Sequence, residues 1–144
     1  MKIYVVIDTN VIVSAMLRCP SIPSSIVACA LSGVITPLLN KEIVSEYRSV
    51  LMRPKFHLTN EIVDSVINTL EETGIYINST KLDLNFPDPK DAVFYEVVME
   101  KKKRDEAFLV TGNIKHFPKE RFVVTPREML EIIFKKTNSD PSMD

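Results

Sequence analysis

The sequence predicts an α/β fold, a three-layer α/β/α sandwich around a central, mostly parallel sheet of about five strands. Short apolar, strand-like runs alternate along the chain with amphipathic helical patterns, and this alternation is typical of parallel sheets covered by helices on both faces. At 144 residues the chain is long enough for one domain with a full core and too short for two ordinary ones. We therefore expect one domain over residues 1–136, followed by a flexible tail at 137–144.

The first predicted strand, residues 3–7, is a continuous run of β-branched and aromatic residues. It has no polar alternation, which is the pattern of a strand buried on both faces of a parallel sheet. Three polar residues follow it at once: Asp8, Thr9 and Asn10. They are therefore expected at the carboxyl end of a strand, the edge at which open α/β sheets bind their ligands.

The remaining elements are predicted from apolar runs, helical spacing of apolar residues and cap residues. The predicted strands are residues 34–39, 75–77, 107–111 and 123–124. The predicted helices are residues 11–17, 24–32, 40–51, 60–73, 88–103 and 126–136. Gly33 marks the end of the second helix, and Asn40 caps the third. The last helix begins with a capping box, Thr125-Pro126-Arg127-Glu128, with proline at its first position.

Composition limits the class of protein. Apolar residues make up 45% and charged residues 26%, so neither disorder nor a membrane protein is predicted. No apolar run approaches the roughly 18 residues of a membrane span, and Asp8 comes too early for a signal peptide, so we expect a cytoplasmic protein. Cys19 and Cys29 are expected to be reduced and not to bind zinc. The net charge of −1 gives no general attraction to a polyanion, so a nucleic acid would need a local basic patch and metal ions.

Two acids in the first half of the chain are candidates for chemistry. Asp8 follows a buried strand, where a lone carboxylate needs a cation or several hydrogen-bond donors. The alternative is that Asp8 and Asn10 merely cap the next helix. Glu46 lies at the edge of the apolar stripe of the third helix, from which its carboxylate could reach the sheet edge. Taken alone, it is also typical of a solvated flank residue.

Two further candidate stretches lie in the second half. Asp88-Pro89-Lys90-Asp91 is a nearly ideal helix start, and capping alone would explain both acids. A cap needs only one of them, however, which leaves Asp91 free to face the crevice at the strand ends. The fourth strand runs into Thr111, Gly112 and Asn113, and the glycine permits a sharp turn or the close approach of a phosphate. An ordinary strand-to-loop turn is the alternative.

In combination, these stretches resemble the PIN domain family, specifically the bacterial group of toxin components of toxin–antitoxin systems. The matching stretches, in order, are Ile7-Asp8-Thr9-Asn10-Val11, Glu46-Tyr47-Arg48-Ser49-Val50-Leu51, Asp88-Pro89-Lys90-Asp91, and Leu109-Val110-Thr111-Gly112-Asn113 followed by Lys115-His116-Phe117-Pro118. By resemblance, Asp8, Glu46 and Asp91 take the positions of the catalytic, metal-binding acids. Asn113 falls where many members have a fourth acid, and an amide oxygen without charge should weaken a second metal position. Asp88, Asp105 and Glu106 are candidates to replace the missing charge.

The resemblance implies an endoribonuclease that hydrolyses RNA phosphodiester bonds with Mg²⁺ or Mn²⁺. Clustered Asp and Glu without Cys or His fit these hard cations, which prefer oxygen ligands. The expected metal ligands are Asp8, Asp91, Glu46 and Asn113, and the expected contacts to RNA are Thr9, Asn10, Thr111 and Lys115, with Asp88 supporting the metal ligands. The partners that the resemblance implies are RNA, a small antitoxin protein and a second copy of the chain, without a membrane.

Other interpretations stay open. The basic run at 101–104 is either a contact to the RNA backbone or a solvated helix end. His57 and His116 are expected on surface loops without a catalytic role. Asn113 motivates the alternative of a catalytically weakened PIN domain that binds RNA or a protein without cleavage. A different α/β hydrolase or phosphotransfer domain, with Asp8 as nucleophile, is a third class. The chain has three glycines and no GxGxxG after the first strand, which disfavours a dinucleotide enzyme.

Overall fold

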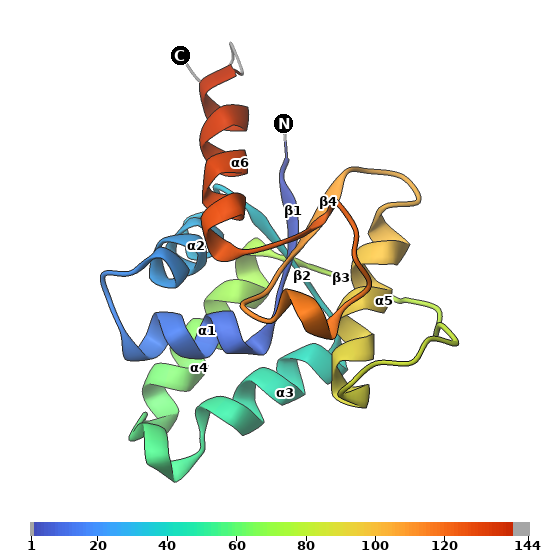
Figure 1. Cartoon of the computed structure of the whole chain (residues 1–144). Helices are drawn as coiled ribbons and strands as arrows, with labels where there is room; N and C mark the ends of the chain where they lie inside the picture. Colours follow the sequence, from blue (N-terminus) through green and yellow to red (C-terminus); the bar gives the residue numbers. More distant parts are fainter. Residues whose placement is uncertain (1, 140–144) are drawn as a thin grey trace.

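The computed structural model describes residues 2–139, and in that range a five-stranded sheet lies between helices on its two faces (Figure 1). Neighbouring strands are all parallel, in the order β3-β2-β1-β4-β5. The strands are β1 (Tyr4–Ile7), β2 (Thr36–Leu39), β3 (Ile75–Tyr76), β4 (Ala107–Val110) and β5 (Val123–Val124). The predicted α/β class is confirmed, and the sheet is wholly rather than mostly parallel.

Helices and short 3-10 turns connect these strands. The helices are α1 (Thr9–Leu17), α2 (Ile22–Leu31), α3 (Lys41–Leu51), α4 (Asn60–Thr73), α5 (Ala92–Lys101) and α6 (Pro126–Ser139). The 3-10 turns are η1 (Pro54–Phe56), η2 (Pro89–Asp91) and η3 (Ile114–His116). Helices α1 to α4 pack against one another and α2 also contacts α6, whereas α5 packs across β1, β2 and β4. The return of the chain from β3 to β4 reverses the direction of travel along the sheet, and a right-handed crossover then puts α5 on the opposite face.

The core is formed by the central strands and the helix faces that cover them. Val5 and Val6 of β1 are fully buried, as are Leu109 and Val110 of β4. Each such side chain contributes roughly 1.5–3 kcal/mol when it is removed from water. The burial predicted from the unbroken apolar run of the first strand is therefore confirmed.

Two helices in the first half begin two residues earlier than predicted. Helix α1 begins at Thr9, because the side chain of Asp8 caps it and accepts a hydrogen bond from the Thr9 backbone N–H at 2.8 Å. Helix α2 begins at Ile22, because Ser21 caps it through a capping box. Pro23 fits within the first turn of α2, where its missing N–H has no partner to lose.

The second half shows two further differences. The helix predicted for 88–103 is divided into η2 and the shorter α5. The predicted capping box of the last helix is confirmed: the Thr125 N–H donates to Glu128 Oε1 at 2.9 Å, and the Glu128 N–H donates to Thr125 Oγ1 at 3.1 Å. Helix α6 continues through Ser139, so the first part of the expected tail is helical. The rest of that tail, residues 140–144, lies outside the described residues.

Within residues 2–139, no single helix is both long enough and apolar enough to cross a membrane. Helices α1 and α2 satisfy the criteria of length and composition only when taken together, and the pair is bent by 104° at its break.

The sheet has a switch point between β1 and β4. From β1 the chain moves outward through β2 to β3, and it then returns to form β4 on the other side of β1. The loops that leave two such neighbouring strands diverge, and open α/β sheets bind ligands in the crevice that results. In this chain Asp8 follows β1 and Thr111 follows β4, so the first and the last of the four matching stretches meet at that crevice.

Candidate active site

A cleft of about 400 Å³ opens at the carboxyl ends of β1 and β4. Asp8, Glu46, Asp91 and Asn113 all line it, although they come from the end of β1, from α3, from η2 and from the loop after β4. The other lining residues are Thr9, Asn10, Val13, Ser14, Val50, Arg53, Phe56, Asp88, Lys90 and His116. The fold therefore brings the four predicted metal ligands to one cleft.

Asp8 is the most deeply placed of these acids, with only 4% of its surface exposed. Its Oδ1 accepts the Thr9 N–H, and its Oδ2 accepts hydrogen bonds from Asn10 Nδ2 at 2.9 Å and from Thr111 Oγ1 at 2.7 Å. Burial raises the pKa of the Asp8 carboxyl, and the charge of Glu46 adds to this, while the three hydrogen bonds lower it; the net pKa lies above its ordinary value. Three donors thus hold the carboxylate in place without fully offsetting the effect of its burial.

Glu46 reaches the sheet edge from α3. Its neighbours Ile43 and Tyr47 are buried in the core, which turns Glu46 toward the end of β1. The Thr9 hydroxyl donates to Glu46 Oε2 at 2.6 Å. Because the Thr9 backbone also donates to Asp8, this one residue links both acids. Tyr47 adds a second link, since its hydroxyl donates to the carbonyl of Ile7, directly before Asp8.

Asp88 and Asp91 have different roles at the start of η2 and α5. Asp88 is the cap and accepts the Lys90 N–H at 3.0 Å, whereas the side chain of Asp91 makes no capping bond. The side chain of Asp91 instead lines the cleft. It is 14% exposed, and His116 Nδ1 lies 3.4 Å from its Oδ2. Burial first, and then the charges of Asp8 and Asp88, raise the pKa of Asp91 to about 6, against the lowering effect of His116.

These observations agree with a comparison to protein families. The family model described as PIN domain matches residues 4–115, which is more than half of the chain. The chain belongs to the PIN domain family. PIN domains are generally nucleases and usually use divalent metal ions. Searches of curated proteins and of solved structures gave no match.

The side chains of this PIN domain suit a hard divalent cation by their chemistry. Asp8, Glu46, Asp91 and Asn113 offer only oxygen ligands that such cations prefer, on a cleft where buried negative charge is incompletely compensated. Within residues 2–139, however, no three Asp, Glu, His or Cys side chains converge closely enough to form a ready-made metal site. Mg²⁺ is usually held by one or two carboxylates and keeps several waters, so the donor set fits such an ion without a closed cage.

Asn113 lies at the mouth of the cleft, exposed, on the loop that follows β4. Of the three acids expected to replace the charge that it lacks, only Asp88 lines the cleft. Asp105 and Glu106 precede β4 and therefore lie at the opposite edge of the sheet, where they pair with Lys101 and with Lys136. The expectation that either of these two compensates Asn113 is wrong.

The residues expected to contact RNA instead position the acids in several cases. Thr111 is completely buried, so its hydroxyl holds Asp8 and accepts the Asn113 N–H, and the expected contact with a phosphate is wrong. Thr9 is 6% exposed and engaged with Glu46. Asn10 joins the two strand ends, because its amide donates to Asp8 while its Oδ1 accepts the Gly112 N–H at 3.0 Å.

Three cationic or titratable side chains line the cleft without having been predicted there: Arg53, Lys90 and His116. His116 was expected on a surface loop, and its contact with Asp91 shows that it belongs to the cleft wall. Lys115 is exposed on the same turn and is not among the residues that line the cleft. Arg53, Lys90 and His116 reach the cleft because η1, η2 and η3 meet in the folded structure, and no local sequence pattern predicts that meeting.

The basic run at 101–104 lies at the end of α5, at the edge of the sheet opposite the cleft. The Lys101 amine lies 3.0 Å from Asp105 Oδ2 and 4.2 Å from the centre of the Tyr4 ring. Lys103 pairs with Glu100 at 3.1 Å. These contacts favour the interpretation of the run as a solvated helix end rather than as part of the site.

Proposed function

We propose that this PIN domain is a Mg²⁺- or Mn²⁺-dependent endoribonuclease. One observation supports the proposal above the others: Asp8, Glu46 and Asp91, far apart in sequence, line one cleft at the switch point of the sheet. Burial, and to a smaller extent neighbouring carboxylates, raise the pKa values of Asp8 and Asp91, so that ionised oxygens in this cleft are unfavourable without a counter-charge. A divalent cation is the natural counter-charge for such a group of oxygen ligands.

In this proposal Asp8, Glu46 and Asp91 hold the ion, which when bound supplies charge stabilisation for the phosphoryl oxygens and an activated water. The chain's own contribution is to hold these acids in position. Thr111 and Asn10 orient Asp8, and Thr9 orients Glu46. His116 Nδ1 lies 3.4 Å from Asp91 Oδ2 and so helps to fix that carboxylate.

The role of Asp8 is tested by cleavage of a labelled single-stranded RNA with Mn²⁺, comparing the wild type with Asp8→Asn. We expect a loss of more than roughly 100-fold, because even partners outside the ligand set are worth about 10- to 100-fold in metal sites. Asp105→Asn is the matched control, since it makes the same chemical change at the far edge of the sheet. Equal activity in the wild type and Asp8→Asn would trace the cleavage to a contaminant and refute the proposal.

A second candidate function is a catalytically weakened PIN domain that binds RNA or a protein without cleavage. Two observations favour it: Asn113 stands in the cleft where many members have an acid, and no ready-made three-ligand metal site exists among residues 2–139. Retention of RNA in a gel-shift assay, with no cleavage in either Mg²⁺ or Mn²⁺, would identify this alternative. A nucleophilic role for Asp8 has less support, because both carboxylate oxygens are engaged and only 4% of the residue is exposed.

The finer assignments rest on the family resemblance. We propose that the cellular partner is RNA, that the protein acts in the cytoplasm, and that it is the toxin of a toxin–antitoxin pair. Both cysteines, Cys19 and Cys29, are free thiols, which suits a reducing compartment. A small antitoxin that inserts a segment into the acidic cleft, and a homodimer, are the assemblies proposed with it. Co-purification of a short partner that abolishes cleavage is the test of the toxin assignment.

A further inference from the structure

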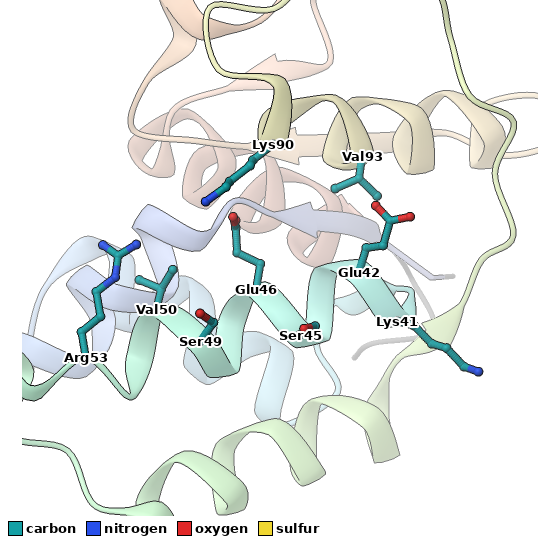
Figure 2. Close-up of a pocket in the computed structure, with 9 residues that line it drawn as sticks. All are labelled: Lys41, Glu42, Ser45, Glu46, Ser49, Val50, Arg53, Lys90 and Val93. Atoms are coloured by element: carbon teal, nitrogen blue, oxygen red, sulfur yellow. The ribbon is translucent and has the colours of Figure 1, made fainter.

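A second hollow, of about 450 Å³, runs along α3 beside the acidic cleft (Figure 2). It is lined by Lys41, Glu42, Ser45, Glu46, Ser49, Val50, Arg53, Lys90 and Val93. Four of these residues, Glu46, Val50, Arg53 and Lys90, also line the acidic cleft. The two hollows therefore adjoin, with Glu46, Arg53 and Lys90 at the junction, and together they are called the groove.

Arg53 and Lys90 place two positive charges at this junction from separate elements. Arg53 follows the end of α3, and Lys90 belongs to η2, which faces it across the groove (Figure 2). Both residues are exposed, and within residues 2–139 neither makes an ion pair with a carboxylate. Glu46 stands at the same junction, but it is one carboxylate beside two cations, so a further anion would lower the repulsion between Arg53 and Lys90.

An RNA strand needs positive side chains of this kind in order to approach the acidic cleft. The acids of the cleft repel phosphates, and the net charge of −1 supplies no general attraction. The basic run at 101–104 lies at the opposite edge of the sheet, with Lys101 and Lys103 paired to acids. Arg53 and Lys90 are the cations that line the acidic cleft among the described residues.

The rest of the groove favours contact with the backbone of a strand rather than with its bases. No aromatic residue is among those that line the α3 portion, so stacking of bases is not offered there. Ser45 and Ser49 instead present short hydroxyl side chains along the same face of α3 (Figure 2). Hydroxyls of this kind contact phosphates and sugars of any sequence, and the charges of Lys41 and Glu42, at the start of α3, oppose one another.

We propose that Arg53 and Lys90 bind the phosphate adjacent to the hydrolysed one, and that a single-stranded RNA continues from there along α3 past Ser49 and Ser45. The inference rests on the proposed function, since it supplies that site with its substrate contacts. In this arrangement Arg53 and Lys90 bind the RNA backbone whatever its sequence, and the acids of the cleft serve hydrolysis of the phosphodiester bond.

The test measures binding of a short labelled single-stranded RNA of mixed sequence as a function of salt, in the Asp8→Asn background, which stops cleavage. Loss of two phosphate contacts should reduce the slope of log K against log salt by about 1.4 for a single strand. At 0.1 M salt this corresponds to a roughly 25-fold weaker affinity of Arg53→Gln/Lys90→Gln. Lys103→Gln/Arg104→Gln is the matched control, because it removes the same two types of charge at the far edge of the sheet.

With Asp8 restored, Arg53→Gln/Lys90→Gln should raise the KM for RNA cleavage and leave kcat nearly unchanged. The Mn²⁺-induced rise in melting temperature should match that of the wild type, and such a match would show that the fold and the metal site are intact. If the double variant does not fold, the single variants Arg53→Gln and Lys90→Gln replace it. Equal slopes for the junction variant and its control would overturn the inference alone. If neither the wild type nor Asp8→Asn binds RNA, the proposed function fails and the inference with it.

Discussion

Removing the charge of Asp91 should stabilise the metal-free protein. This carboxylate lies on the cleft wall with 14% of its side chain exposed, and burial together with Asp8 and Asp88 raises its pKa from 3.8 to about 6. A folded-state pKa above the unfolded value means that the protonated acid favours the fold. That contribution is fully present below about pH 4 and is lost as the pH rises through about 6. At pH 7.5 the ionised carboxylate therefore opposes folding.

The size of the effect follows from the pKa. A change from 3.8 to about 6 corresponds to about 3 kcal/mol when complete. Asp91→Asn also loses the favourable interaction of a negative charge with the start of α5, about 0.3–1 kcal/mol, and solvent screens part of the remainder. A net gain of about 1–2 kcal/mol remains, which raises the melting temperature by roughly 3–8 °C for a chain of this length.

Urea and thermal unfolding with a chelator present measure this gain between pH 4 and pH 8. Asp105→Asn is the control, an exposed acid at the other edge of the sheet whose removal should change stability by less than about 0.5 kcal/mol. With Mn²⁺ the ranking should invert, because a bound ion stabilises the wild type in proportion to its affinity. An Asp91→Asn protein that is less stable at pH 7.5, or whose advantage does not shrink toward pH 4, would refute the reasoning.

Three further substitutions have expected outcomes. Asn113→Asp should tighten Mn²⁺ binding by roughly tenfold or more, since a unit charge about 4 Å from a cation contributes up to about 4 kcal/mol; unchanged affinity in calorimetry would place this side chain away from the ion. Thr111→Val should lower stability in urea by about 1–3 kcal/mol, because the buried Asp8 carboxylate loses a donor, and a neutral result would mean that Asp8 is already protonated. Gly74→Ala should destabilise by about 1–3 kcal/mol, because its new Cβ would lie 2.5 Å from the carbonyl oxygen of Pro37; wild-type stability would show that the backbone relaxes freely there.

Much of the fold and part of the site follow from local sequence. The unbroken apolar run before Asp8 predicts both a central strand and the place where a ligand binds, because strand burial and strand direction are local properties. Asp91 is predicted for a similar reason, since Asp88 already satisfies the cap and leaves the second acid unused. Strand direction could also have excluded Asp105 and Glu106 from the site, because they precede β4 and therefore lie at the amino end of that strand, away from the cleft.

The remaining site residues depend on tertiary packing. His116 and Lys90 lie on 3-10 turns, and Arg53 lies just before one, so their approach to the cleft is set by how η1, η2 and η3 meet. The role of Thr111 likewise depends on tertiary packing. Its position at a strand end is predictable, but whether the hydroxyl faces a ligand or Asp8 depends on side chains 103 residues away in sequence.

The placement of Asp8 at the end of the central strand, β1, has a consequence for dynamics. The outermost strands, β3 and β5, have two residues each, so they are the parts of the sheet expected to open first in local unfolding. The Asp8 amide is bonded to the Val110 carbonyl at 3.0 Å, at the carboxyl end of the β1–β4 ladder, and β4 and β2 separate β1 from the two outermost strands. Its hydrogen exchange should therefore be slower than that of the amides in β3 and β5, so that fraying of either border leaves the position of Asp8 undisturbed.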